Sequence, residues 1–237
     1  MSIAANLSAI HQRIARAAAR AGRNPETVAL MAVTKTQPAS RIVDAYEGGQ
    51  RLFGENRVQE FEGKAGALTQ LDGVDFHMIG HLQSNKAAKA VEIFHAVDSL
   101  DSAKLGDRLN AAAAKLHKTV GVLIEINIAG EQAKSGIAPD SPELQQILLA
   151  APRWPYLRLQ GLMTVPPFTE DPEGARPYFR KLRELRDSLA ARSLPAISLE
   201  ILSMGMSHDF EVAIEEGSTC VRVGTAIFGQ REYPPLP

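Results

Sequence analysis

Cysteine is almost absent from this sequence, and neither sign of charge is in excess. Cys220 is the only cysteine, so no disulfide can form within the chain, and a reducing compartment is expected. Lysine and arginine number 26 against 27 acidic residues, and the basic residues are scattered. A nucleic-acid-binding protein would carry a basic patch, so this class of protein is not expected.

Long apolar runs are absent as well, since no stretch approaches the roughly 20 residues that span a bilayer. Residues 1–25 contain arginine and alanine but no acid, which is also typical of a mitochondrial transit peptide. The helical spacing of Ile3, Leu7, Ile10 and Ile14 favours a structural helix instead. We therefore expect a cytoplasmic protein without a membrane partner.

Two common kinds of active site find no support in the pattern of residues. No spacing of histidine, cysteine and carboxylate side chains is typical of a metal site. No serine lies in the Gly-x-Ser-x-Gly pattern of a nucleophile elbow. The function is therefore expected to need no metal ion.

Strand-like and helix-like segments alternate along the chain. Expected strands cover residues 28–35, 51–55, 76–80, 93–98, 120–127, 159–165, 198–203 and 220–228. Expected helices cover 38–48, 56–71, 83–92, a segment capped by Ser99 or Asp101 that runs to Leu116, a segment starting at Ser141, 171–192 and 207–216.

This alternation predicts the fold class, α/β with a single (β/α)8 TIM barrel and an extra N-terminal helix. Each of the first seven expected strands is followed by a helix, and the N-terminal helix can fill the eighth place in the outer ring. A doubly wound open sheet would have fewer strands and a glycine-rich first turn, which residues 34–38 lack. One domain is expected over residues 1–237, with a disordered or surface tail at 234–237.

Lys35 is the first candidate site residue. It ends an apolar strand that begins at Val28, and Pro38 then suits the first turn of a helix. The carboxyl ends of barrel strands carry the ligand sites of this fold. A lysine at a strand end is often an ordinary rim residue, so further residues are needed to support a chemical role.

A phosphate site is expected near Lys35, in the two loops where this fold often binds phosphate. The first is the loop from Ser203 through Gly205 to Ser207, which is expected to open the last helix. The second contains Gly224 and Thr225. Glycine allows close approach of the backbone to an anion, and the hydroxyls and helix dipole add donors and positive charge.

Three further polar residues are expected at this rim or inside the barrel. Arg222 alternates with two valines in the last strand, so it is expected to point into the barrel, either paired with Glu125 or contacting a ligand. Asn56 follows the second strand and His81 the third. Each of these two could cap a helix or contact a substrate.

A rim lysine beside a phosphate site narrows the ligand to a phosphorylated aldehyde or ketone. A lysine amine condenses with a carbonyl group when it can lose its proton. The ligand could be a sugar phosphate, as in a Schiff-base aldolase, or pyridoxal 5'-phosphate (PLP).

Several motifs in sequence order resemble a known family. They are 32–36 (AVTKT), 53–60 (FGENRVQE), 77–86 (HMIGHLQSNK), 161–164 (GLMT), 202–210 (LSMGMSHDF) and 221–229 (VRVGTAIFG). Over residues 3–233 the chain resembles the PLP homeostasis protein family, which is similar to the N-terminal barrel domain of alanine racemase.

The resemblance implies a role for each candidate residue. Lys35 would carry PLP as a Schiff base, and Arg222 would face the pyridine nitrogen, with Asn56 and His81 nearby. The phosphate would be surrounded by Ser203, Gly205, Gly224 and Thr225.

The resulting hypothesis is a PLP-binding protein that serves intracellular vitamin B6 and amino-acid homeostasis without robust catalysis. It is expected to act as a monomer, with PLP-dependent apo-enzymes as recipients of the cofactor. The alternative is a PLP-dependent amino-acid racemase of weak activity, and a third hypothesis is a Schiff-base aldolase. No residue is assigned a catalytic role.

Overall fold

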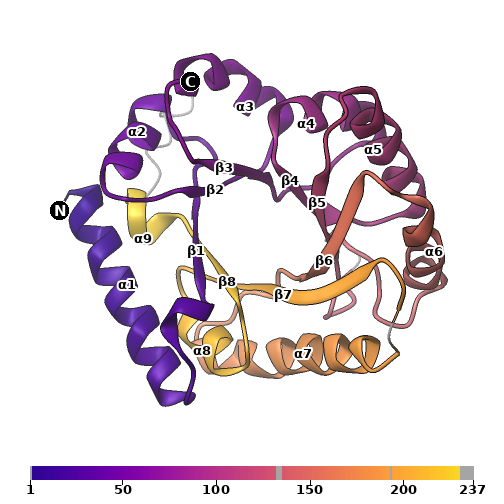
Figure 1. The fold of residues 1–237 in the computed structure, drawn as a ribbon. Helices are drawn as coiled ribbons and strands as arrows, with labels where there is room; N and C mark the ends of the chain where they lie inside the picture. Colours follow the sequence, from indigo (N-terminus) through magenta and orange to yellow (C-terminus); the bar gives the residue numbers. More distant parts are fainter. Residues whose placement is uncertain (1, 132–134, 193, 230–237) are drawn as a thin grey trace, which may run out of the picture.

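A closed barrel forms the centre of the protein. The computed structural model describes residues 2–131, 135–192 and 194–229. Eight parallel strands follow one another around the barrel in chain order, and helices surround them (Figure 1). β1 pairs with both β2 and β8, so the sheet has no open edge. The expected (β/α)8 barrel is confirmed, whereas the expected tail at 234–237 lies outside the described residues.

The strands of the barrel are short and largely buried. They are β1 (Ala29–Val33), β2 (Leu52–Glu55), β3 (Asp75–Met78), β4 (Ala96–Leu100), β5 (Val120–Glu125), β6 (Leu157–Met163), β7 (Ile197–Met206) and β8 (Cys220–Val223). Helices cover one face of this sheet and side chains fill the other, which explains the nearly unbroken apolar runs in the sequence. Cys220 is buried as a free thiol, and burial raises the pKa of that thiol to about 12.

The helices form the outer ring. They are α1 (Ile3–Arg20), α2 (Ala39–Glu47), α3 (Val58–Ala65), α4 (Ala87–Ile93), α5 (Ala103–Lys115), α6 (Pro142–Ala150), α7 (Arg176–Ala190), α8 (Phe210–Glu215) and α9 (Thr225–Phe228). Three of the expected helices begin later or end earlier than predicted because a 3-10 turn takes part of each range: Gly66–Leu68 after α3, Ser84–Lys86 before α4 and Pro172–Ala175 before α7.

α1 occupies the place in the outer ring where a long helix after β8 would otherwise lie. It lies between α2 and α8 in the ring, and it also contacts α9 (Figure 1). The apolar stripe Ile3, Leu7, Ile10 and Ile14 is buried as expected. The N-terminal segment is therefore a structural helix of the barrel.

Strand β4 lies two to three residues later than predicted. The apolar pair Ile93 and Phe94 ends α4 instead of starting the strand, because Lys118 Nζ donates to the Phe94 carbonyl at 2.6 Å and holds that helix end. The strand then includes Ser99. The expected caps Ser99 and Asp101 are therefore wrong, and the cap of α5 is Ser102, which accepts from the Leu105 amide.

Strand β7 continues through the segment that was predicted to be a loop. It pairs with β8 at Ser203 with Cys220 and again at Met206 with Arg222, with a shift of register between the two pairs. Gly205, at φ +93°, supplies the irregularity. α8 consequently begins at Phe210, so the prediction that the 203–207 loop opens the last helix is wrong.

Residues 220–228 differ from the prediction in a similar way. β8 ends at Val223, and the expected strand to residue 228 is replaced from Thr225 onward by the short helix α9. Asn6 on α1 donates to the carbonyl of Ile227, at the end of α9, at 2.8 Å. This contact from a distant part of the chain has no local signal in residues 220–228.

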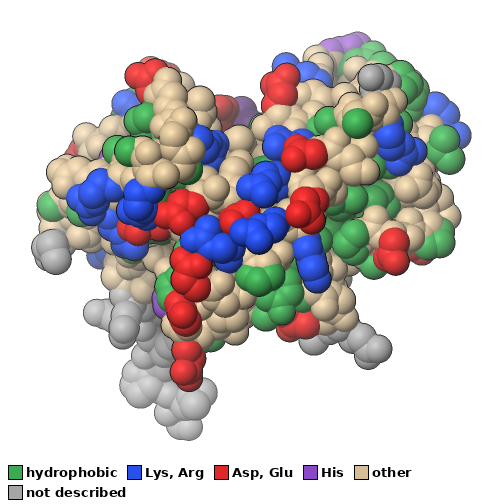
Figure 2. Space-filling view, turned by 90° about the horizontal axis from the view of Figure 1, so that it is seen from below, with side chains coloured by type: hydrophobic (Ala, Val, Ile, Leu, Met, Phe, Trp, Pro, Cys, Tyr) green, Lys and Arg blue, Asp and Glu red, His purple; other side chains and the backbone are tan. Residues whose placement is uncertain are grey.

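Acidic and basic side chains interleave on the face that carries α7 and α8. Figure 2 shows them as a band of mixed red and blue. Glu216 pairs there with Arg176, Arg180 and Arg183, all on α7. Mixed charge of this kind is unlike the basic patch of a nucleic-acid-binding surface. Among the described helices, none has the length and apolar character that a transmembrane span requires.

Candidate ligand-binding site

A cavity of about 310 Å³ opens at the carboxyl ends of the strands. Residues that follow or end β1, β2, β7 and β8 border it, as expected for a barrel of this class. The predicted site residues that line it are Lys35, Asn56, Arg222, Gly224 and Thr225.

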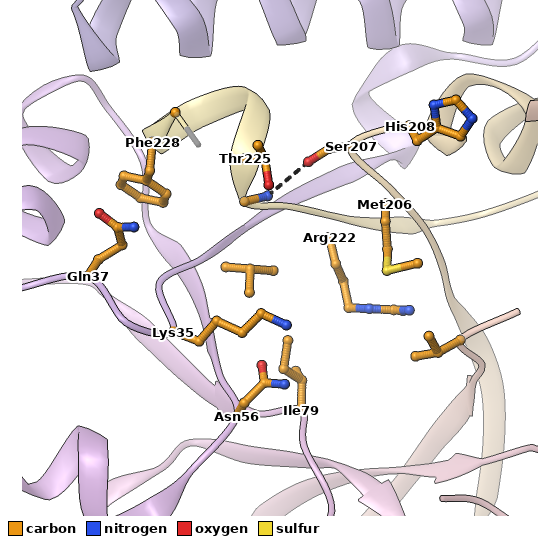
Figure 3. A pocket seen from close by; sticks show the side chains of 14 residues that line it. Lys35, Gln37, Asn56, Ile79, Met206, Ser207, His208, Arg222, Thr225 and Phe228 are labelled. Atoms are coloured by element: carbon orange, nitrogen blue, oxygen red, sulfur yellow. Dashed lines mark hydrogen bonds between the residues drawn. The ribbon is translucent and has the colours of Figure 1, made fainter. Parts of the chain in front are cut away.

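Lys35 lies in the turn between β1 and α2, two residues after the strand ends. Its side chain reaches toward the centre of the cavity, with Asn56 below it and Arg222 to the right (Figure 3). The next residue, Thr36, has φ +65°, a left-handed conformation that is rare for a β-branched residue. The expectation that Lys35 stands at the carboxyl end of the first strand agrees with this geometry.

Asn56 follows β2 and borders the cavity next to Lys35. Its Oδ1 atom is buried without a hydrogen-bond partner among the described residues. Leaving a buried acceptor unpaired costs about 1–3 kcal/mol. A hydrogen bond donated to this atom would remove that cost.

Arg222 points into the barrel, as its alternation with two valines predicted. Its Nη1 donates to Ser203 Oγ and its Nη2 to the Thr164 carbonyl, both at 2.7 Å. Burial lowers the pKa of the guanidinium, which nevertheless remains charged because arginine is such a strong base. Glu125, the possible ion-pair partner, instead accepts from Ser135 Oγ at 2.8 Å.

Ser207 joins the two loops that were expected to bind phosphate. Its Oγ accepts from the amides of Gly224 and Ala226 at 3.3 and 3.4 Å, and Figure 3 marks the first of these contacts. Both distances are at the long end for hydrogen bonds. Asp209 fixes the turn because its carboxylate accepts from the Met206 amide at 2.6 Å, and burial raises the pKa of that carboxyl.

Three predicted residues lie outside the cavity lining. Ser203 is fully buried and accepts from Arg222. Gly205 packs so tightly against α8 that an added Cβ would lie 2.5 Å from Ala213 Cβ. His81 is exposed and pairs with Asp101 at 3.1 Å. Ligand contacts by these residues remain predictions.

Met206, Ser207 and His208 also line the cavity but were not among the predicted contacts. A signal existed for Ser207, because it is a hydroxyl residue near a glycine in the expected phosphate loop. No local signal existed for Met206, since its position depends on how far β7 continues. Among the described residues, no three His, Cys, Asp or Glu side chains group closely enough to bind a metal.

The barrel and its cavity define a class of protein: a (β/α)8 barrel with a lysine and the loops of Ser207 and Gly224 at the same rim. Residues 5–232 match the family model described as the alanine racemase N-terminal domain. The PLP homeostasis protein of Aquifex aeolicus is 45% identical over 233 residues, which cover 98% of this chain and all of that relative. The chain belongs to the PLP homeostasis protein family.

Two solved structures agree with this assignment. A protein from Bifidobacterium adolescentis, described as unknown, has a TM-score of 0.83 and 38% identity, with 95% of this chain and 94% of that chain covered. PipY from Synechococcus elongatus, whose structure has PLP bound, has a TM-score of 0.80 and 35% identity, with 96% of this chain and 100% of that chain covered. The expected family resemblance is confirmed.

Proposed function

We propose that this chain binds PLP in the Lys35 cavity and holds it through a covalent bond to the Lys35 side chain. One observation carries the proposal: Lys35 and the contact between Ser207 and Gly224 border the same cavity of about 310 Å³. That volume is within the range of about 300–1,000 Å³ typical of ligand pockets. The names of the relatives, and the PLP bound to PipY, support the choice of cofactor.

The proposed phosphate site is formed by Ser207, Gly224 and Thr225. The two long contacts to Ser207 leave the amides of Gly224 and Ala226 able to donate more strongly to an anion. Because α9 begins at Thr225, these amides also lie at the positive end of a short helix. Ser203 and Gly205, the other two predicted neighbours of the phosphate, lie outside the cavity lining. They would support this loop from its buried side.

The proposed covalent bond joins Lys35 Nζ to the aldehyde carbon, and one water molecule leaves. The amine must lose a proton before it can attack. Asn56 Oδ1, which lacks a partner among the described residues, would accept a hydrogen bond from the bound molecule. When bound, PLP supplies an aldehyde for this bond and, if its ring nitrogen is protonated, an electron sink for amino-acid chemistry.

Arg222 is the reason for proposing a carrier without robust catalysis. A permanent positive charge beside the ring nitrogen would disfavour protonation of that nitrogen. Among the described lining residues, none is a tyrosine that could serve as a second base. The chain would therefore hold and buffer PLP instead of using it in catalysis. In the same proposal, it acts in the cytoplasm as a monomer and passes PLP to apo-enzymes.

The test is the visible spectrum of the purified protein with PLP, followed by borohydride reduction and peptide mapping. We expect a yellow protein with the reduced pyridoxyl group on Lys35. Lys35→Ala should abolish the label without lowering the melting temperature, because a rim residue contributes little to the core. The control Lys104→Ala, at an exposed lysine on α5, should keep the label. Labelling only at other lysines would refute the proposal.

A second measurement separates the carrier from the weak racemase. Alanine incubated with the PLP-loaded protein in deuterated water should gain deuterium at the alpha carbon no faster than with free PLP. A faster exchange that disappears in Lys35→Ala would replace the carrier proposal by the racemase.

A further inference from the structure

The turn that carries Lys35 lies next to three charged residues from β2 and α3, the strand and helix that follow it in the barrel. Glu55 ends β2, and Glu60 and Lys64 lie one helical turn apart on α3. Lys64 Nζ is 2.8 Å from Glu55 Oε1 and 3.1 Å from Glu60 Oε1. The Lys64 side chain is only 9% exposed and that of Glu55 is 0% exposed. We call these three residues the Lys64 cluster.

The Lys64 cluster binds the backbone on both sides of Lys35. Lys64 Nζ donates to the carbonyls of Thr34 and Gln37, each at 3.0 Å. Glu60 Oε1 accepts from the Thr36 amide at 2.5 Å. The backbone is therefore held immediately before Lys35, immediately after it, and once more at Gln37.

These contacts fall where the turn is strained. Thr36 has φ +65°, and a left-handed conformation of a residue with a Cβ costs about 1–2 kcal/mol. Such a conformation persists only where the surroundings hold it. The acceptor on the Thr36 amide and the donor on the Gln37 carbonyl supply contacts of this kind next to Lys35.

A signal for this role exists in the sequence. Val58, Phe61 and Lys64 follow one another at a spacing of three, and all three are buried on α3. A lysine in a buried helical stripe is costly unless several acceptors surround its ammonium group. Lys64 has acceptors on two carboxylates and two backbone carbonyls, and both carbonyls belong to the turn that contains Lys35.

We propose that Lys64 is a positioning residue for Lys35. It holds the turn so that the Lys35 amine faces the anion-binding loop at Ser207 and Gly224. This inference rests on the proposed function, because it concerns the reaction of Lys35 with PLP. Without the Lys64 ammonium group, the carbonyls of Thr34 and Gln37 lose their side-chain donor, and the turn relaxes away from the cavity.

The test compares Lys64→Met with a matched control, Lys118→Met. Methionine keeps most of the apolar stem and removes the donors. Lys118 Nζ also donates to two backbone carbonyls, those of Val91 and Phe94 at 2.8 and 2.6 Å, but away from the cavity. Each variant is incubated with PLP, and the rate of borohydride-trapped label on Lys35 is followed by peptide mapping. The melting temperature is measured without PLP.

We expect both variants to lose stability, and only Lys64→Met to label Lys35 more slowly, by about ten- to a hundredfold. Misplacement of a reacting group by about 1 Å can cost about a hundredfold in rate. The absorption maximum of the bound cofactor should also shift in Lys64→Met alone. If Lys64→Met labels Lys35 at the wild-type rate, or if Lys118→Met slows labelling equally, the positioning role is refuted.

A milder variant covers the case in which Lys64→Met does not fold. Glu60→Ala removes the acceptor on the Thr36 amide from a partly exposed position, and it should slow labelling of Lys35 in the same direction but less. A folded Glu60→Ala that labels at the wild-type rate would contradict the inference. A wild-type protein that is never labelled on Lys35 would instead refute the proposed function, so the two failures are distinguishable.

Discussion

Arg222 Nη1 donates a 2.7 Å hydrogen bond to Ser203 Oγ, joining β8 to its neighbour β7 on the inner face of the barrel. Ser203 was predicted to surround a phosphate, yet its hydroxyl is fully buried behind the cavity. Its observed contact orients the guanidinium that borders the cavity. The effect of Ser203 on a ligand would therefore act through Arg222.

Ser203→Ala should lower the free energy of unfolding by about 1.5–3 kcal/mol, the usual contribution of a hydrogen bond to a charged group. It should also shift the absorption maximum of bound PLP, because Arg222 loses one of the contacts that orient it. Urea unfolding and visible spectra measure the two effects. In the control, Ser99→Ala removes a buried serine bond to the Gly80 carbonyl, and it should cost about 1 kcal/mol without a spectral shift. Equal costs in the two variants would contradict the prediction.

The pair of His77 and Asp98 should make stability depend on pH. Burial acts to lower the pKa of His77, but the Asp98 carboxylate at 3.1 Å outweighs it, and the net pKa is raised. A raised histidine pKa contributes stability that is fully present below the unfolded value of about 6.5 and is lost as pH rises through the folded value. His77→Gln should therefore be most destabilising at low pH, by about 1.5–3 kcal/mol.

Urea unfolding at about pH 5.5 and at about pH 8.5, on either side of the ordinary histidine pKa, measures this dependence. His95→Gln is the control, because burial lowers the pKa of His95. A lowered histidine pKa costs stability as pH falls, so the pH dependence in this variant should change in the opposite sense. A His77→Gln effect that is the same at both pH values would show that the pair is not charged.

Glu216 should stabilise the contact of α8 with α7. Burial acts to raise the pKa of Glu216, but the guanidinium groups of Arg180 and Arg176 outweigh it, and the net pKa is lowered. A lowered carboxyl pKa contributes stability above the unfolded value of about 4.3, which is lost as pH falls through the folded value. Glu216→Gln should cost about 1–3 kcal/mol at neutral pH, since the carboxylate is buried but the arginines are partly exposed.

The control for Glu216→Gln is Glu62→Gln, which removes an exposed pair with Lys89 and should cost much less, because exposed ion pairs contribute little to stability. Thermal unfolding at neutral pH and at about pH 4 compares them. The gap between the two variants should narrow at the lower pH. A Glu216→Gln variant as stable as Glu62→Gln would show that the arginine contacts contribute nothing.

Gly205→Ala should destabilise the barrel by more than about 1 kcal/mol, because φ is +93° and a Cβ would lie 2.5 Å from Ala213 Cβ and 2.9 Å from Phe210 Cα. Gly63→Ala is the matched control on α3. Nothing lies within 4 Å of an added Cβ there, so alanine should stabilise the helix by about 0.5–1 kcal/mol. Chemical unfolding measures both changes. A tolerated Gly205→Ala would contradict the tight packing of β7 against α8.

Sequence patterns predicted well those elements whose signal, a periodic apolar stripe or a capping residue, lies within a short stretch of the chain. The stripe of α1 is periodic, and Ser141 followed by Pro142 places the start of α6 because capping depends on adjacent residues. The position of Lys35 at the end of an apolar run was readable for the same reason. Eight such strands, most followed by a helix, have few compact solutions other than a closed barrel.

Other features depend on contacts between residues far apart in the chain. β7 continues past Gly205 because it pairs with β8. The Ser203 hydroxyl accepts a hydrogen bond from Arg222, which is 19 positions away in the chain. The support of the Lys35 turn by Lys64 depends in the same way on the position of α3 next to the turn that follows β1.

By itself, the sequence determined the order of strands and helices, the barrel, and the lysine at its rim, because periodicity and capping are local. Only the tertiary structure decided which side chains reach the cavity and which hold its walls. Closing the barrel brings the ends of distant strands to one rim, and the distances between those ends have no counterpart in local sequence.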